Sequence, residues 1–201
     1  MKNFKEYNLN ITGTITIGAD VGQELDFYLQ NNIDNMVFFE PRLGPFLDLQ
    51  EKVSRYPGKN IQCFNIALGE KDETRNMYVA GGGQSSSFLK PKLHLQMHPE
   101  ILFSNPPLLC NLKTLDSFNF SSIFNFIHID VQGFELSVLK GARQTLHNIH
   151  AISSEINVIE LYEDCVLLDD LDKFLSSFGF KRIESDVNAQ GWGDALYIKN
   201  L

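Results

Sequence analysis

The sequence predicts an α/β fold with a doubly wound, mostly parallel sheet of seven strands, and three observations support this prediction. Short apolar runs alternate with segments of helical spacing along most of the chain, which is the pattern of consecutive strand–helix–strand units. Several of these runs are apolar throughout, as expected for parallel strands covered by helices on both faces. Two strand-like segments follow the last helical segment, so we expect a C-terminal hairpin with one antiparallel strand.

The elements are expected in the following order. TITI at residues 14–17 is a β-branched run that ends at a glycine turn, and MVFFE at 36–40 is a second strand after a helix over 24–30. IQCFNIAL at 61–68 is expected to be the third strand, preceded by a helix around 46–53. The pattern then predicts strands at 124–131, 150–157, 180–185 and 194–199, with helices over 138–146 and 167–178 between them.

Residues 80–110 interrupt this alternation. A run of three glycines, a glutamine and three serines is followed by four prolines, which prevent a long helix. Long loop-rich segments in compact domains usually carry function, so we expect a lid that contacts the acceptor. The composition predicts a single domain over residues 1–201, which is equally compatible with a domain taken from a longer chain.

Composition and charge argue against several classes of protein. A net charge of −8 argues against nucleic-acid binding, which normally draws on an excess of Lys and Arg. No apolar stretch approaches the roughly 20 residues of a spanning helix, so we expect no membrane insertion. Three widely spaced cysteines without a C-x-x-C pair indicate neither a disulfide framework nor a zinc site, and they favour a reducing, cytoplasmic location.

Three of the predicted strands end at an acidic residue: Asp20, Glu40 and Asp130. Ligands of open α/β sheets bind beyond the carboxyl ends of the strands, so we expect these acids to meet in one crevice. Gly18 and Gly22 let the backbone of the first turn approach a ligand closely. Glu40 lies about twenty residues beyond this turn, the separation at which an acid meets a ribose diol. The sequence therefore predicts an adenosine-like ligand.

The turn favours S-adenosylmethionine over NAD. It lacks the third glycine of G-x-G-x-x-G and any nearby basic residue, so it is poorly suited to a pyrophosphate. The amino and sulfonium groups of S-adenosylmethionine are both positive and suit Asp20 and Asp130. A dinucleotide oxidoreductase, and a tight turn without a ligand, are the alternatives.

Seven motifs carry a resemblance to a known family: GADVGQ, FFEP, NIALGEKDE, QSSSF, LKTLDSF, HIDVQGFELSVLKGA and GDALYI. In their order and spacing, residues 14–199 resemble the FkbM-type S-adenosylmethionine-dependent methyltransferases. The resemblance implies a class I methyltransferase (Rossmann-like) fold. It also implies methyl transfer to a hydroxyl group of a sugar or a natural product.

The resemblance also assigns cofactor-binding residues. It places Gly18, Ala19, Asp20, Gly22 and Gln23 in the cofactor turn, Glu40 at the ribose, Asp130 beside the methionyl end, and Asn65 to Ala67 along the adenine. Three positions depart from the family pattern. Thr16 stands where the family usually has an acid, Asp20 where it has Asn, and Gln132 where it has Glu.

A sugar hydroxyl is a weak nucleophile that benefits from a base, and Asp130, Glu135 and His128 are the candidates. Each also has a structural interpretation. Asp130 is about as suited to holding the cofactor amine, Glu135 stands in the first turn of a helix where the dipole favours an acid, and His128 lies on a buried strand. A metal is not expected, although Asp130 and Glu155 form a minority hypothesis for a divalent cation.

Acceptor-binding candidates are Ser86, His94, His98 and Trp192. His94 and His98 are one helical turn apart and lie on one face if the segment is helical. Ser86 belongs to a run that is also ordinary loop, and Trp192 stands between two glycines, where it either stacks on a sugar or packs on the sheet.

The sequence therefore predicts an S-adenosylmethionine-dependent O-methyltransferase for a carbohydrate hydroxyl. The alternatives are an O-methyltransferase for a non-sugar small molecule and a non-catalytic cofactor-binding module. Fusion to or pairing with a glycosyltransferase is a further expectation.

Overall fold

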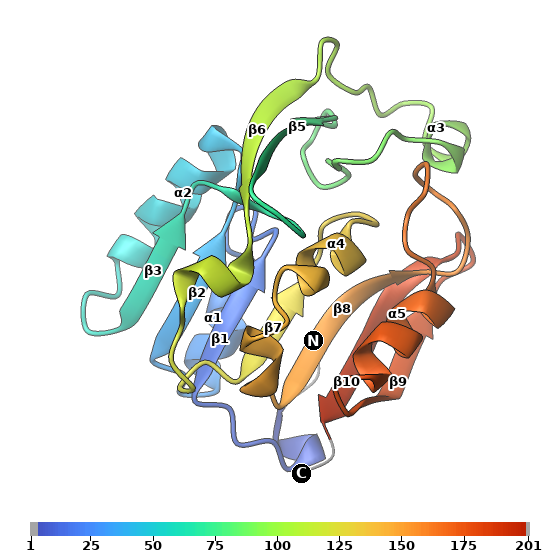
Figure 1. Ribbon diagram of the computed structural model, residues 1–201. Coiled ribbons are helices and arrows are strands. Elements are labelled where there is room, and N and C mark those ends of the chain that lie inside the picture. Colours follow the sequence, from blue (N-terminus) through green and yellow to red (C-terminus); the bar gives the residue numbers. More distant parts are fainter. Residues whose placement is uncertain (1–3, 200–201) are drawn as a thin grey trace.

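The computed structural model describes residues 4–199 and contains a seven-stranded sheet in the order β3-β2-β1-β7-β8-β10-β9 (Figure 1). Its strands are β1 (Gly13–Ile17), β2 (Asn35–Phe39), β3 (Asn60–Phe64), β7 (Phe126–Ile129), β8 (Ala151–Asn157), β9 (Phe180–Val187) and β10 (Trp192–Lys199). The pairs among β3, β2, β1, β7 and β8 are parallel, and β10 is antiparallel to both β8 and β9. The predicted doubly wound sheet with its antiparallel C-terminal hairpin is confirmed.

Helices cover both faces of this sheet, and each face has its own core (Figure 1). The helices are α1 (Leu25–Gln30), α2 (Leu43–Ser54), α3 (Leu93–Met97), α4 (Glu135–Lys140) and α5 (Leu168–Ser176), with 3-10 turns η1 (Phe4–Tyr7), η2 (Leu115–Phe118) and η3 (Thr145–His147). Leu25 of α1 and Leu49 of α2 pack on one face, and Leu139 of α4 and Leu171 of α5 pack on the other. Each of these four side chains is fully buried and contributes roughly 1.5–3 kcal/mol.

The residues predicted to form the third strand are divided between two sheets. Pairing with β2 ends at Phe64, opposite Phe39, and the two-residue strand β4 (Ala67–Leu68) belongs to a three-stranded sheet with β5 (Glu73–Met77) and β6 (Leu108–Lys113). The prediction of one strand over 61–68 was wrong because β2 offers no partner beyond Phe39. The predicted helix over 138–146 is likewise divided into α4 and η3.

Residues 78–107, here called the 78–107 segment, leave the second sheet between β5 and β6. Apart from the short helix α3 and isolated bridges, the segment is irregular, as the glycines and prolines predict. It is held to the loop after β8 because the backbone N–H groups of Lys92 and His94 donate to the carbonyl of Leu161, at 2.9 and 3.1 Å. No helix within the described residues is long and apolar enough to span a membrane.

Candidate functional site

A cavity of about 330 Å³ lies at the carboxyl ends of β1, β2 and β7. This volume falls within the range of about 300–1,000 Å³ that is usual for small-molecule sites. Apolar side chains, among them Phe39, Met77 and Phe134, form much of its wall. The strand-end acids Asp20, Glu40 and Asp130 all line it, so the crevice predicted from the sequence exists.

Most of the predicted site residues line this cavity. The lining set comprises Gly18, Ala19, Asp20, Gln23, Glu40, Ala67, Ser86, His94, His98, Asp130, Glu155 and Trp192. Four predicted residues lie outside it: Gly22, Asn65, His128 and Glu135. Each of these four supports a residue or backbone segment of the cavity wall.

The glycine turn after β1 brings two backbone segments into close contact. Gly18 has a φ of +81°, and a Cβ atom there would lie 1.9 Å from the carbonyl oxygen of Asp130. Asp20 also adopts a positive φ, of +45°. The turn thus places the ends of β1 and β7 side by side, and a larger residue at position 18 cannot be accommodated without moving one of them.

We expect Gly18→Ala to lower the free energy of unfolding by about 2 kcal/mol, because a left-handed alanine is strained and its Cβ meets backbone. Gly44→Ala is the matched control, since Gly44 lies in α2 with open space around its Cβ position. There we expect a change of less than about 1 kcal/mol, in the stabilising direction. Urea unfolding followed by circular dichroism measures the free energy of unfolding of both variants. Equal values for Gly18→Ala and Gly44→Ala would contradict the tight contact at Gly18.

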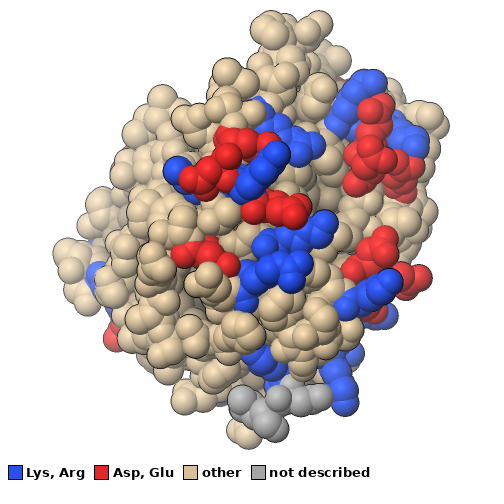
Figure 2. Space-filling model, in the orientation of Figure 1, with Lys and Arg blue, Asp and Glu red and all other residues tan. Residues whose placement is uncertain are grey.

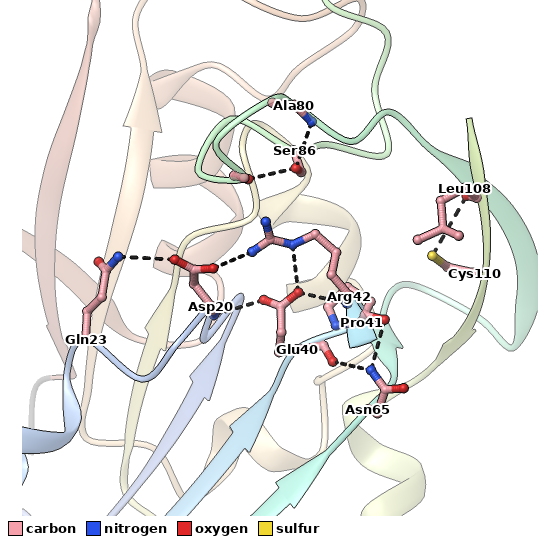
Figure 3. Close-up of polar contacts among 11 residues, drawn as sticks. Asp20, Gln23, Glu40, Pro41, Arg42, Asn65, Ala80, Ser86, Leu108 and Cys110 are labelled. Atoms are coloured by element: carbon pink, nitrogen blue, oxygen red, sulfur yellow. Dashed lines mark hydrogen bonds and ion pairs between the residues drawn. The ribbon is translucent and has the colours of Figure 1, made fainter. Parts of the chain in front are cut away.

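A buried ion-pair network joins the turn to the end of β2 (Figure 3). Glu40, which is only 2% exposed, accepts hydrogen bonds through Oε1 from the backbone N–H and the Nε of Arg42, and through Oε2 from the backbone N–H of Asp20. The other end of the Arg42 guanidinium donates to Asp20 Oδ1 at 2.7 Å. Arg42 therefore connects the two acids of the predicted cofactor turn.

Sequence reasoning missed Arg42, and the expectation that the turn has no basic residue nearby was wrong. Arg42 follows Glu40 by two residues and is N-terminal to α2, but its contact with Asp20 exists only in the fold. Burial opposes the charge on Arg42, but the hydrogen bond and charge of Glu40 outweigh it and raise the pKa of the guanidinium. The turn is therefore partly neutralised by a fixed positive charge.

Two of the predicted cofactor residues support this network from outside the cavity. Asn65 donates through Nδ2 to the carbonyl oxygens of Glu40 and Pro41, at 2.9 and 3.0 Å, and so fixes the end of β2 (Figure 3). Gly22 closes the turn: its N–H donates to Ala19, and its carbonyl accepts from Lys52 Nζ at 2.7 Å.

A second polar cluster lies at the ends of β7 and β8. Gln132 Nε2 donates to Asp130 Oδ1 at 2.8 Å and to Glu155 Oε1 at 2.9 Å. The single hydroxyl hydrogen of Tyr162 is shared between the carbonyl oxygen of Ser85, at 2.9 Å, and Gln132 Oε1, at 3.1 Å. The Asp130 carboxyl opens to the cavity. Gln132 and Tyr162, which sequence reasoning did not name as site residues, therefore organise the two carboxyl groups.

The surroundings of this cluster favour the protonated form of its carboxyl groups. Asp130 opens to the cavity, but the protein groups around it still desolvate its carboxyl and raise its pKa, while the Gln132 hydrogen bond and the charge of His128 oppose that rise. Burial and the neighbouring charges of Asp130 and Glu135 raise the pKa of Glu155 well above its ordinary value. The arrangement thus disfavours two full negative charges at the same time.

The catalytic candidates Glu135 and His128 take supporting positions. Glu135 Oε1 accepts the backbone N–H groups of Val131 and Gly133, both at 3.1 Å, and so fixes the loop that carries Gln132. Burial raises the pKa of Glu135 to about 7. His128 Nε2 lies 3.5 Å from Glu24 Oε1, and Glu24 itself lines the cavity.

The 78–107 segment supplies the outer wall of the cavity. His94 lies in α3 and His98 directly follows that helix, and their rings lie 5.0 Å apart on the cavity wall. His94 is only 5% exposed, and burial, together with His98, lowers its pKa. Ser86 bonds to Gly83 and Ala80 of its own loop, whereas Trp192 begins β10 and is 38% exposed.

Charge on the molecule is mixed in sign. Figure 2 shows Lys and Arg interleaved with Asp and Glu on the face that carries α4 and α5, without a continuous basic surface there. Among residues 4–199, no group of three or more His, Cys, Asp or Glu side chains is arranged to hold a metal ion.

Residues 16–182 match the family model described as the methyltransferase FkbM domain. The 2-O-methyltransferase NoeI of Sinorhizobium fredii is 27% identical over 190 residues, which cover 86% of this chain and 76% of that protein. Magnesium protoporphyrin IX methyltransferase (ChlM) of Synechocystis PCC 6803, solved with bound S-adenosylmethionine, has a TM-score of 0.52 at 9% identity and covers 98% of this chain and 74% of its own.

Sp1610 of Streptococcus pneumoniae, whose suggested activity is tRNA (m1A22) methylation, has a TM-score of 0.54 at 12% identity. This match covers 97% of the present chain and 67% of that one. At these identities the two structures show the fold, which is the class I Rossmann-like fold predicted from the sequence.

Proposed function

The chain belongs to the methyltransferase FkbM domain family, and from this premise we propose that it transfers a methyl group from S-adenosylmethionine to a hydroxyl group of a carbohydrate. One observation carries the proposal: the glycine turn, the buried acid Glu40 and the open acid Asp130 all line a single cavity of suitable volume.

Glu40 retains capacity for a ribose hydroxyl. A carboxylate has about four lone-pair sites, and three are occupied by the N–H groups of Asp20 and Arg42. Oε2 accepts only one of these bonds, so it has a free site. The geometry therefore fits a ligand whose hydroxyl donates to Glu40, in agreement with an adenosine group.

An acidic group suits the other end of the ligand. Glu24 lines the cavity and would face the ammonium group of the methionyl end, so that Asp130 remains free for the acceptor. S-adenosylmethionine, when bound, supplies a methyl group on a positively charged sulfur. Arg42 lies at the opposite, ribose side and is already paired with Asp20 and Glu40, so its charge does not cancel that of Glu24.

The residues of the chain would act on the acceptor in two ways. Asp130 would take the hydroxyl proton as the new bond to carbon forms, a role that typically contributes about 10²–10⁴-fold. The 78–107 segment would position the acceptor and exclude water, since alignment of the reacting atoms is a large part of such a displacement.

The outer wall supports a carbohydrate acceptor. The half-exposed Trp192 ring offers an apolar face for a sugar ring, and His94 and His98 offer hydrogen-bonding groups. The 2-O-methyltransferase relative is consistent with a hydroxyl acceptor. The net charge of −8 and the mixed surface favour a neutral or cationic acceptor over a nucleic acid.

Calorimetric titration of the purified protein with S-adenosylmethionine, S-adenosylhomocysteine and NAD tests the cofactor. We expect micromolar binding of the two adenosyl ligands, equivalent to about 8 kcal/mol, and no heat with NAD. A folded protein that binds none of them would exclude the methyltransferase proposal, and preference for NAD would indicate an oxidoreductase.

A radiolabelled methyl-transfer assay then tests the acceptor class. Neutral sugars and amino sugars are compared with phenolic acceptors and with tRNA, all at the same donor concentration. Label in the sugars alone supports the carbohydrate assignment, and label only in a phenol or in tRNA would replace it.

A further inference from the structure

A single glutamine side chain joins the two carboxyl groups at the ends of β7 and β8. Both hydrogens of the Gln132 amide are used, one on Asp130 Oδ1 and one on Glu155 Oε1, and its carbonyl oxygen accepts from Tyr162. This orientation follows from the chemistry, because a carbonyl oxygen facing two carboxyl groups would be repelled.

The position of Gln132 is fixed from several directions. Its φ is +56°, its backbone carbonyl oxygen accepts the Ser87 hydroxyl at 2.8 Å, and Tyr162, which bonds to its side chain, is only 1% exposed. The loop that carries it is held by Glu135 through two backbone N–H groups. Gln132 therefore cannot turn away from the carboxyl groups without breaking buried contacts.

Glu155 completes the arrangement. It is 6% exposed, and its second oxygen, Oε2, is buried without a hydrogen-bond partner among the described residues. A buried carboxylate oxygen without a donor is costly, and the neighbouring charges of Asp130 and Glu135 add to the cost of ionising Glu155. A protonated Glu155 beside an ionised Asp130 leaves one negative charge for the pair.

We propose that Gln132 is a positioning residue that holds Asp130 and Glu155 as a pair with a single negative charge, and so allows deprotonation of the acceptor without a divalent cation. The inference rests on the proposed function. In the methyl transfer, the acceptor hydroxyl oxygen forms a bond to the methyl carbon, and the hydroxyl proton moves to Asp130. The carbon–sulfur bond of the donor breaks and its electron pair stays on sulfur.

The uncharged amide of Gln132 makes this pair of carboxyl groups a poor site for a divalent cation. A carboxylate at position 132 would bring a third acidic oxygen ligand to Asp130 and Glu155, which is the ligand type that Mg²⁺ and Mn²⁺ prefer. Gln132→Glu is therefore expected to bind Mn²⁺ at least about tenfold more tightly than the unmodified protein. Gln84→Glu is the matched control, because Gln84 also lines the cavity but bonds to neither carboxyl group.

Calorimetry with MnCl₂, without any donor or acceptor, measures this directly. Tight binding by Gln132→Glu alone supports the inference, and equal weak binding by all three proteins overturns it. Because the readout needs no methyl donor, a failure to bind S-adenosylmethionine would refute the proposed function without affecting this result.

Gln132→Met provides a second measurement if the first variant does not fold. The groups that face the pair are His128 on β7, Glu135 on α4, Asp194 on β10 and Tyr162 after β8. The Gln132 hydrogen bond lowers the pKa of Asp130, so its loss is expected to move the acid limb of the kcat profile to higher pH. A lower kcat with an unmoved limb would show a merely structural role.

Discussion

Asp130→Asn is expected to lower kcat by about 10²–10⁴-fold while the dissociation constant of S-adenosylhomocysteine changes by less than about tenfold. The reason is that the amide oxygen of the variant can still accept the Gln132 hydrogen bond, whereas an amide cannot take a proton. In the unmodified protein, kcat is expected to rise with pH through the raised pKa of Asp130, because only the ionised form is a base. This rise should be absent in the variant.

Asp34→Asn is the control, since Asp34 pairs with Lys59 on the surface before β2 and does not line the cavity. It should retain activity within about threefold of the unmodified protein. Weak S-adenosylhomocysteine binding with a normal kcat in Asp130→Asn would instead assign Asp130 to the cofactor amine.

The unfolding temperature of Asp130→Asn shows whether the substitution damages the fold. Desolvation within the cavity raises the pKa of Asp130 in the folded state, so its ionised form reduces stability as pH rises from the unfolded to the folded pKa, by a small amount because the carboxyl is open to solvent. The variant should therefore unfold at the same or a higher temperature than the unmodified protein at about pH 8. A lower unfolding temperature would mean that loss of activity reflects damage to the fold.

Glu40→Ala is expected to lower the free energy of unfolding by about 3 kcal/mol, because it leaves a buried guanidinium with one of its two partners. For a chain of this size this corresponds to a fall of roughly 6–12 °C in Tm. Loss of a charged acceptor for the ribose should also weaken S-adenosylhomocysteine binding by about tenfold to hundredfold.

Glu51→Ala removes a pair of the same chemistry, since Glu51 bonds to Arg55 one turn later on the exposed side of α2. We expect this substitution to lower the free energy of unfolding by less than about 0.5 kcal/mol. Glu40→Gln should recover part of the stability but not the binding. Thermal unfolding and calorimetry test both expectations, and equal costs for Glu40→Ala and Glu51→Ala would disprove the structural role of the network.

Apolar runs with acidic ends were enough to predict the sheet and the cavity at its edge. The burial of β2 and β7 follows from side-chain hydrophobicity, and Asp20, Glu40 and Asp130 meet because parallel strands end at the same edge. The division of residues 61–68 was not predictable, because the sequence of one strand does not reveal where its partner ends.

The polar contacts within the site were harder to predict. Arg42 pairs with Asp20 across 22 residues of chain, and Tyr162 reaches Gln132 across 30. Such contacts depend on side-chain positions that no local pattern encodes. The acidic helix start at Glu135 was predicted, but its use as an acceptor for backbone N–H groups required the positive φ of Gly133 and the sharp turn that it makes.

The place where the 78–107 segment leaves and rejoins the second sheet has an evolutionary consequence. Met77 and Leu108 are paired across β5 and β6, so the segment starts and ends at adjacent points. Its length and sequence can diverge at little cost to the strands that carry it, because loop-closure entropy changes slowly with length. The cofactor turn lies on other elements altogether. The outer wall of the cavity can thus change by exchange of one continuous piece of gene, provided that the contacts of Ser85 with Tyr162 and of Ser87 with Gln132 are kept.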